Sequence, residues 1–259
     1  MLVMKFGGAS VSGPESFSKV ANIIIERAKG QEKIVVVVSA MANQTDELLQ
    51  LAKKVHSNPP TRELDMLISV GERISIALLA MALQKQGKEA VSFTGSQSGI
   101  ITCENHSNAN IVEMRPKRLF EALSEGKVAI VAGFQGMSRK GEITTLGRGG
   151  SDTSAVALAV ATGAERVEFY KDVGGIYDAD PKKKSDAKLF PRLGFKEAME
   201  LADQGAKVLH RRCIALAEKN GVQLSVHSFN DPKVAGTVVG FGSQRNSQLS
   251  YEEPVCLRN

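Results

Sequence analysis

Two runs of five apolar residues constrain the fold more than any other feature of this sequence. Residues 34–38 and 128–132 contain no polar side chain, and uninterrupted apolar runs of this length are typical of strands buried on both faces of a parallel sheet. Further strands are expected at 2–6, 89–93, 142–146, 166–170 and 223–227, and helix-like segments lie between them, at about 45–55, 65–86, 115–123, 153–162, 195–203 and 207–219. This alternation predicts an α/β fold with a mostly parallel sheet and helices on both faces.

Composition excludes several classes of protein. The 259 residues are 42% hydrophobic and 24% charged, with no tryptophan and a net charge of +5, which argues against disorder and against a stacking platform for single-stranded nucleic acid. The basic triplet Lys182-Lys183-Lys184 is interpreted as a solvated loop, so no nucleic-acid partner is expected.

The cysteines and the apolar segments indicate a cytoplasmic protein. Cys103, Cys213 and Cys256 are odd in number and far apart, which fits a reducing compartment and gives no disulfide or zinc pattern. No apolar stretch is expected to reach membrane-spanning length, and the N-terminus lacks the features of a signal peptide, so no membrane contact is expected.

The segment 144–153, Thr-Thr-Leu-Gly-Arg-Gly-Gly-Ser-Asp-Thr, predicts an anion site. Glycines let a backbone approach a ligand, and the first N–H groups of the helix that follows point outward without partners. Gly147 to Asp152 also resembles a dinucleotide fingerprint, but Asp152 replaces the third glycine, which weakens an NAD-dependent oxidoreductase as an interpretation.

Lys5, directly before Phe6-Gly7-Gly8, is a second candidate for phosphate binding. A lysine at a strand end beside exposed backbone N–H groups can hold a polyphosphate. An ordinary edge lysine followed by a tight turn is the alternative, and no Walker A loop is present.

Seven motifs follow one another along the chain. They are Lys-Phe-Gly-Gly-Ala-Ser-Val (5–11), Val-Val-Ser-Ala-Met (37–41), Val-Gly-Glu-Arg (70–73), Ala-Gly-Phe-Gln-Gly (132–136), the 144–153 segment, Lys-Asp-Val with Ile-Tyr-Asp-Ala-Asp-Pro (171–181) and Gly-Ala-Lys-Val-Leu-His (205–210). In order and spacing they resemble the catalytic domain of aspartate kinases, members of the amino acid kinase family. The resemblance covers about residues 3 to 240.

The resemblance implies a three-layer αβα sandwich and phosphorylation of the side-chain carboxylate of L-aspartate by MgATP, the first step towards lysine, threonine and methionine. It implies that Asp152 orients two catalytic lysines, Lys5 and Lys207. The implied acceptor contacts are Ser39, Thr45, Glu72, Arg148 and Ser151, with Arg148 on a carboxylate and Glu72 on the α-ammonium. The implied ATP contacts are Lys5, Phe6, Gly7, Gly8, Lys171, Asp172, Tyr177, Lys182, Lys207 and Val208. Mg²⁺ is expected on ATP oxygens and water, without a protein ligand cluster.

Several of these residues could also have purely structural roles. Glu72 and Arg73 also fit a structural ion pair, Asp152 a helix N-cap, and Ser39 a strand-end turn residue. His106 and His210 are expected to be structural. There are two alternative functions: a kinase of the same family that acts on another amino acid, and a non-catalytic partner subunit that binds a nucleotide.

The expected organisation is one catalytic domain at 1–241. An acceptor-binding lobe is expected at about 1–140, a nucleotide-binding lobe at about 141–241, and a polar, mobile tail at 242–259. The resemblance implies a homodimer, and the length predicts that this chain has no ACT regulatory domain.

Overall fold

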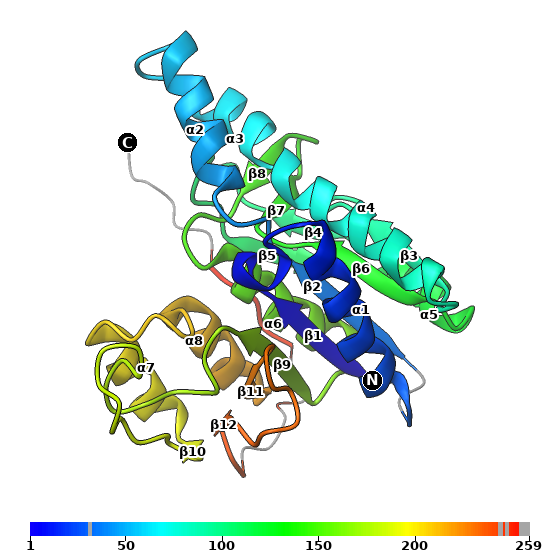
Figure 1. The fold of residues 1–259 in the computed structure, drawn as a ribbon. Helices are drawn as coiled ribbons and strands as arrows, with labels where there is room; N and C mark the ends of the chain where they lie inside the picture. The colour runs from blue at the N-terminus through cyan, green and yellow to red at the C-terminus, as the bar shows by residue number, and fades with distance from the viewer. Residues whose placement is uncertain (31–32, 243–245, 247–248, 254–259) are drawn as a thin grey trace.

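A computed structural model describes residues 1–30, 33–242, 246 and 249–253. Its main feature is an eight-stranded sheet (Figure 1). In spatial order the strands are β10 (Arg192–Leu193), β12 (Thr237–Val239), β11 (Gln223–Ser228), β9 (Arg166–Lys171), β1 (Leu2–Phe6), β2 (Ile34–Val38), β6 (Val128–Ala132) and β3 (Ala90–Phe93). Neighbours from β11 to β3 are parallel, whereas β12 runs antiparallel to β11. The expected mostly parallel sheet is confirmed, and all five residues of β1, β2 and β6 are buried.

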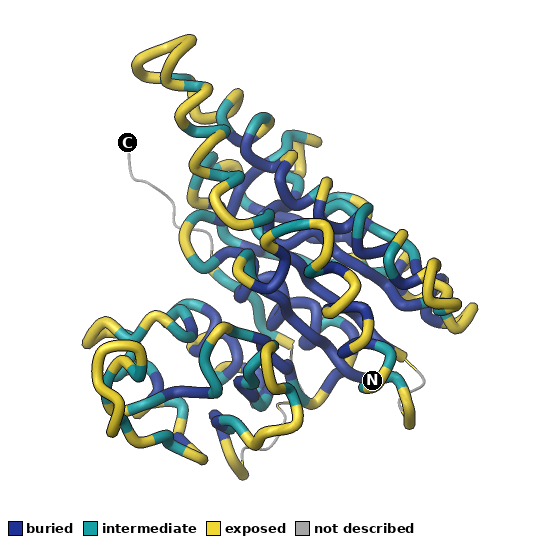
Figure 2. Tube along the Cα trace, in the orientation of Figure 1, coloured by how far each residue is buried: buried dark blue, intermediate teal, exposed yellow. Residues whose placement is uncertain are grey.

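Helices cover both faces of this sheet. The helices α1 (Pro14–Ala28) and α4 (Val70–Lys85) share one apolar core with Leu2, Met4 and Phe6 of β1. On the other face, α5 (Lys117–Ser124), α6 (Gly150–Thr162) and α8 (Arg211–Asn220) share a second core with Val3, and α7 (Phe195–Asp203) packs against α8. Figure 2 shows the buried strands between these helices. The three-layer αβα sandwich is therefore confirmed.

A second, four-stranded sheet was not anticipated. Its order is β5 (Ile111–Met114), β4 (Ile100–Thr102), β7 (Gln135–Ser138) and β8 (Ile143–Thr145). The expected strand 142–146 is part of it, but the sequence predicted no strand for the other three members. These strands are three or four residues long and contain polar residues, so neither a continuous apolar run nor a clear alternation marks them.

The apolar helix expected at 65–86 is two helices, α3 (Thr61–Ile68) and α4, which meet at Ser69. A Cβ at residue 71 would lie 2.7 Å from the Ala40 Cβ, so the glycine permits close approach of α4 to the end of β2. By length and composition alone, the segment Thr61–Lys85 is long and apolar enough to span a membrane, so the expectation that no apolar stretch reaches that length is wrong there. Half of its most apolar part is buried inside the protein.

The C-terminal segment docks in part onto the fold. Ser250 N–H donates to the Asn220 side chain at 2.9 Å, and the Glu252 carboxylate forms an ion pair with Arg212. The mobile tail expected at 242–259 therefore has ordered contacts at residues 250–252, whereas 243–245, 247–248 and 254–259 lie outside the described residues. The division into two lobes near residue 140 stays a prediction.

Candidate active site

Three charged side chains meet where β1, β9 and α6 come together. Lys5 Nζ lies 2.7 Å from Oδ1 of Asp152, and Lys171 Nζ lies 3.0 Å from Oδ2. Lys5 and Asp152 are 4% and 6% exposed. Burial by itself would raise the pKa of Asp152, but Lys171 and Lys5 outweigh it and hold the pKa at about 2. Burial lowers the pKa of Lys5, and Asp152 opposes that effect. The cluster is a carboxylate that keeps two cations side by side.

Local backbone geometry places Asp152 at this point. Gly149 precedes α6 with a φ of +73°, a left-handed conformation that favours glycine. A Cβ there would also lie 2.3 Å from Cγ of His210. Asp152 stands in the first turn of α6 without capping it, so the N-cap alternative does not describe its role: both oxygens face lysines.

A cavity of about 490 Å³ opens beside this cluster, a volume within the range of small-molecule sites. Seven expected site residues line it: Lys5, Ser39, Thr45, Glu72, Arg148, Ser151 and Asp152. We call it the acceptor pocket. Residues from the ends of β1 and β2, from α2 (Gln44–Val55), from α4 and from the loop before α6 therefore meet in one place, at the carboxyl ends of the central strands.

Glu72 is a buried carboxylate with spare capacity. It is 3% exposed, its Oε1 accepts a 3.0 Å hydrogen bond from Ala40 N–H, and its Oε2 has no partner among the described residues. Burial raises the pKa of Glu72 to about 7 despite that hydrogen bond. No ion pair joins Glu72 to Arg73 within the described part of the chain, so the structural-pair alternative is not what the structure shows. The free oxygen can receive a cation.

Arg148 supplies the opposite charge in the acceptor pocket. Its side chain is exposed at the pocket wall, and no described residue forms an ion pair with it. A guanidinium can bind a carboxylate through two parallel hydrogen bonds. The pocket thus presents an unpaired cation and an unpaired buried acceptor, which together suit a zwitterionic ligand.

The expected ATP residues divide between two places. Tyr177, Lys207 and Val208 line a second cavity of about 390 Å³, between the loop after β9 and the loop after α7; we call it the nucleotide pocket. Asp172 and Lys182 form an ion pair near it. Lys207 is exposed there and is not among the residues lining the acceptor pocket, so the structure differs from the expectation that Asp152 pairs with Lys207. Lys171, expected only as an ATP contact, occupies that position.

Among the expected ATP contacts at residues 6–8, the backbone is better placed to contact a ligand than the side chains are. Phe6 is fully buried and its ring stacks on Tyr170 at 4.7 Å, so its side chain cannot reach a ligand. A Cβ on Gly8 would lie 2.9 Å from the Ala40 carbonyl oxygen, and one on Gly7 would lie 3.5 Å from Lys5 Nζ. Glycine at position 8 therefore lets this backbone pass close to the segment that follows β2, whereas a side chain at position 7 would only be in van der Waals contact with Lys5.

Both histidines that were expected to be structural have structural contacts. His106 Nδ1 lies 2.8 Å from Oδ2 of Asp65, and His210 caps α8 by accepting from Arg212 N–H at 3.3 Å. Sequence reasoning missed Asp65, and also Phe134, which lines the acceptor pocket with a positive φ of 68°. Asp65 stands in none of the motifs, and Phe134, although part of the 132–136 motif, has an apolar side chain that indicates no chemistry.

Comparisons with known proteins agree with this geometry. Residues 1–228 match the model of the amino acid kinase family, and the chain belongs to that family. It is 50% identical to an aspartokinase from Corynebacterium efficiens over 258 residues, which is 98% of this chain and 60% of that relative.

Solved structures show the same similarity. The aspartate kinase from Synechocystis superposes with a TM-score of 0.86 at 45% identity, over 98% of this chain and 42% of that one. Aspartokinase III from E. coli in complex with aspartate and ADP superposes with a TM-score of 0.83 at 28% identity, over 96% of this chain and 66% of that one. The chain thus spans about 60% of the length of the curated relative described above.

Proposed function

We propose that this chain transfers the γ-phosphoryl group of ATP to the side-chain carboxylate of L-aspartate and so makes 4-phospho-L-aspartate, the entry to lysine, threonine and methionine synthesis. The observation that supports this most is the acceptor pocket, where a free arginine and a half-satisfied buried glutamate lie beside the two lysines on Asp152. The aspartokinase relatives, and the aspartate and ADP bound to the E. coli enzyme, support the same assignment.

In this proposal the acceptor is held at both of its ends. Oε2 of Glu72 receives the α-ammonium, Arg148 pairs with a carboxylate, and Ser39, Thr45 and Ser151 supply polar contacts. Glu72 is buried and has lost most of its hydration, so its carboxylate is stabilised when the α-ammonium of the acceptor binds beside it.

The transfer step needs positioning and charge neutralisation, without a nucleophilic side chain. A substrate carboxylate oxygen attacks the γ-phosphorus, the bond to the β-phosphate oxygen breaks, and ADP leaves. Lys5 and Lys171, held by Asp152, neutralise the phosphoryl oxygens as charge develops there. Lys207 approaches the same phosphates from the nucleotide pocket.

The nucleotide is proposed to lie between the nucleotide pocket and Lys5. Tyr177 and Val208 would contact the nucleoside, and Lys182, Asp172 and the backbone of Gly7 and Gly8 the polar groups. Asp152 gives both oxygens to lysines and is not free as a metal ligand, so Mg²⁺ would be held by ATP oxygens and water. Assembly as a homodimer and a cytoplasmic location remain proposals from the family resemblance.

The test is to incubate the chain with MgATP, L-aspartate and hydroxylamine, and to measure the hydroxamate that forms from an acyl phosphate. We expect ATP-dependent hydroxamate from aspartate and much less from glutamate. No product with aspartate from a folded chain would refute the proposal, and a product only with another amino acid would change the acceptor. Nucleotide binding without any product would favour a non-catalytic subunit.

A further inference from the structure

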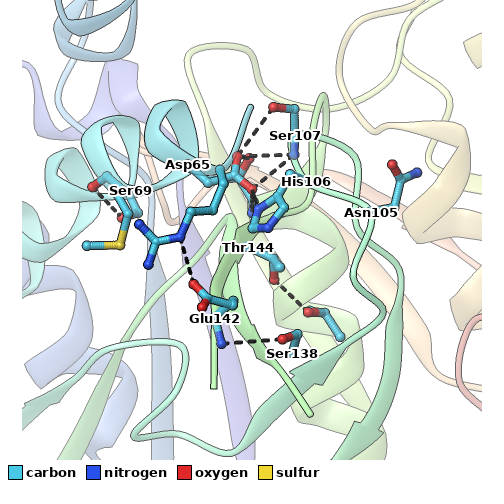
Figure 3. A network of polar contacts seen from close by, with 12 residues as sticks. Asp65, Ser69, Asn105, His106, Ser107, Ser138, Glu142 and Thr144 are labelled. Atoms are coloured by element: carbon cyan, nitrogen blue, oxygen red, sulfur yellow. Dashed lines mark hydrogen bonds and ion pairs between the residues drawn. The ribbon is translucent and has the colours of Figure 1, made fainter. Parts of the chain in front are cut away.

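Asp65, on α3, is a buried carboxylate that the proposed mechanism does not use. It is fully buried, and its two oxygens accept from the backbone N–H of Thr145 at 3.1 Å, the Thr145 hydroxyl at 2.6 Å and the Ser107 N–H at 3.0 and 3.1 Å. The Ser107 hydroxyl at 3.4 Å and His106 Nδ1 at 2.8 Å complete the set. Figure 3 shows Ser107 and His106 converging on Asp65. An ionised carboxylate can only accept, so all these groups act as donors to it.

These hydrogen bonds hold two segments that lie on either side of Gly147. Thr145 ends β8, two residues before Gly147, and Ser107 belongs to the loop between β4 and β5. A Cβ on Gly147 would lie 2.9 Å from Oδ1 of Asn108 and 3.0 Å from the Ser107 carbonyl oxygen. Asp65 therefore fixes the backbone position of Arg148, through Thr145 before it in the chain and through the Ser107 loop packed beside Gly147.

The loop conformation depends on these contacts. Ser107 has a φ of +66°, a left-handed conformation that costs a non-glycine residue free energy. Its backbone N–H and its hydroxyl both donate to Asp65. Asp65 thus keeps in place a backbone arrangement that the loop alone does not favour.

The position of Asp65 on α3 relates it to Glu72. Ser69 N–H donates to the Asp65 backbone carbonyl oxygen at 3.1 Å, the usual helical bond, and Ser69 is the junction from which α4 continues to Glu72. The Ser69 carbonyl oxygen in turn accepts from the Gln135 side chain at 2.7 Å. The Asp65 side chain therefore holds the strand that leads to Arg148 against the helix pair that carries Glu72.

We propose that Asp65 is a positioning residue that sets the separation between Glu72 and Arg148, and with it the length of the acceptor that the pocket takes. This inference rests on the proposed function. If Glu72 and Arg148 are held at a fixed separation, the pocket selects an amino acid whose ammonium and carboxylate match that separation. If the separation varies, a longer acceptor can also bind.

The test uses Thr145→Val and Asp65→Asn. Thr145→Val keeps the shape of the side chain and removes one donor, while Asp65→Asn places an amide N–H against backbone donors. We expect Thr145→Val to raise the KM for aspartate by about tenfold, and to narrow the preference for aspartate over glutamate, with the KM for ATP changed less than about twofold. Asp65→Asn should have a larger effect in the same direction.

Glu168→Gln is the matched control. Glu168 is another buried carboxylate, 1% exposed and paired with Arg27, but it lines neither pocket. Glu168→Gln should lower the thermal midpoint without changing the KM for aspartate or the preference for aspartate over glutamate.

The outcomes separate the two proposals. If the wild-type chain makes no hydroxamate from aspartate, the proposed function is refuted. If the wild type is active and folded Thr145→Val keeps its aspartate KM and its preference, or Glu168→Gln shifts them equally, the positioning role is refuted. Failure of Asp65→Asn to fold leaves Thr145→Val to decide.

Discussion

Replacing Glu72 with glutamine should stabilise the free protein at alkaline pH while damaging aspartate binding. Burial raises the pKa of Glu72 from 4.5 to about 7, so between these values the folded state binds a proton that the unfolded state has released. Stability contributed by this group is therefore fully present below about pH 4.5 and is lost as the pH rises through about 7.

The size of this effect follows from the shift. Raising the pKa of Glu72 from 4.5 to about 7 corresponds to about 3 kcal/mol of unfolding free energy, most of which falls between pH 5 and pH 8. Glu72 is only 3% exposed, so solvent screening reduces this little. Glutamine lacks the ionisation, so the stability of Glu72→Gln relative to wild type should rise by that amount over the same interval.

The assay is urea denaturation of both proteins at pH 5 and pH 8, without substrates. Parallel pH dependence of the two unfolding free energies, within about 1 kcal/mol, would refute the reasoning about burial. In activity, Glu72→Gln should raise the KM for aspartate far more than that for ATP, and the wild-type KM for aspartate should fall as the pH rises through about 7, because only the ionised carboxylate attracts an ammonium.

Four further substitutions test the other parts of the site. Arg148→Ala should chiefly raise the KM for aspartate, and Asp152→Ala should chiefly lower kcat; steady-state kinetics showing the reverse would overturn both roles. Lys171→Gln should lower kcat by about tenfold or more if it neutralises the phosphoryl group, and a change confined to the KM for ATP would return it to nucleotide binding. Gly149→Ala should lower the thermal midpoint and the activity together, because a Cβ there would lie 2.3 Å from His210 at a φ of +73°; an unchanged midpoint would contradict this.

Much of the fold could be predicted because two of its central strands, β2 and β6, are uninterrupted apolar runs. Neither strand has an exposed residue, and such runs have few alternatives to a buried parallel sheet. Most of the second sheet could not be predicted in the same way, because Ile100–Thr102 and Gln135–Ser138 become strands through their tertiary neighbours.

The acceptor pocket could be predicted as a set of residues more easily than as a set of contacts. Ser39, Glu72 and Arg148 lie in the expected motifs at strand and helix ends, and the structure places them in one pocket. The sequence could not show whether Lys171 or Lys207 is the second lysine paired with Asp152, because that depends on where the fold places each side chain. The hydrogen bonds of Asp65 join segments 41 to 80 residues apart in sequence and leave no local pattern.

The central claim is that the phosphoryl group is placed on the side-chain carboxylate of aspartate by this chain. The measurement is borohydride reduction of the product formed from MgATP and L-aspartate, followed by identification of the resulting amino alcohol. Phosphorylation of the side chain gives homoserine, which we predict, in an amount that depends on ATP and is lost in Asp152→Ala. The isomer with the alcohol on the α-carbon side, or no reducible product from the folded chain, would contradict the account.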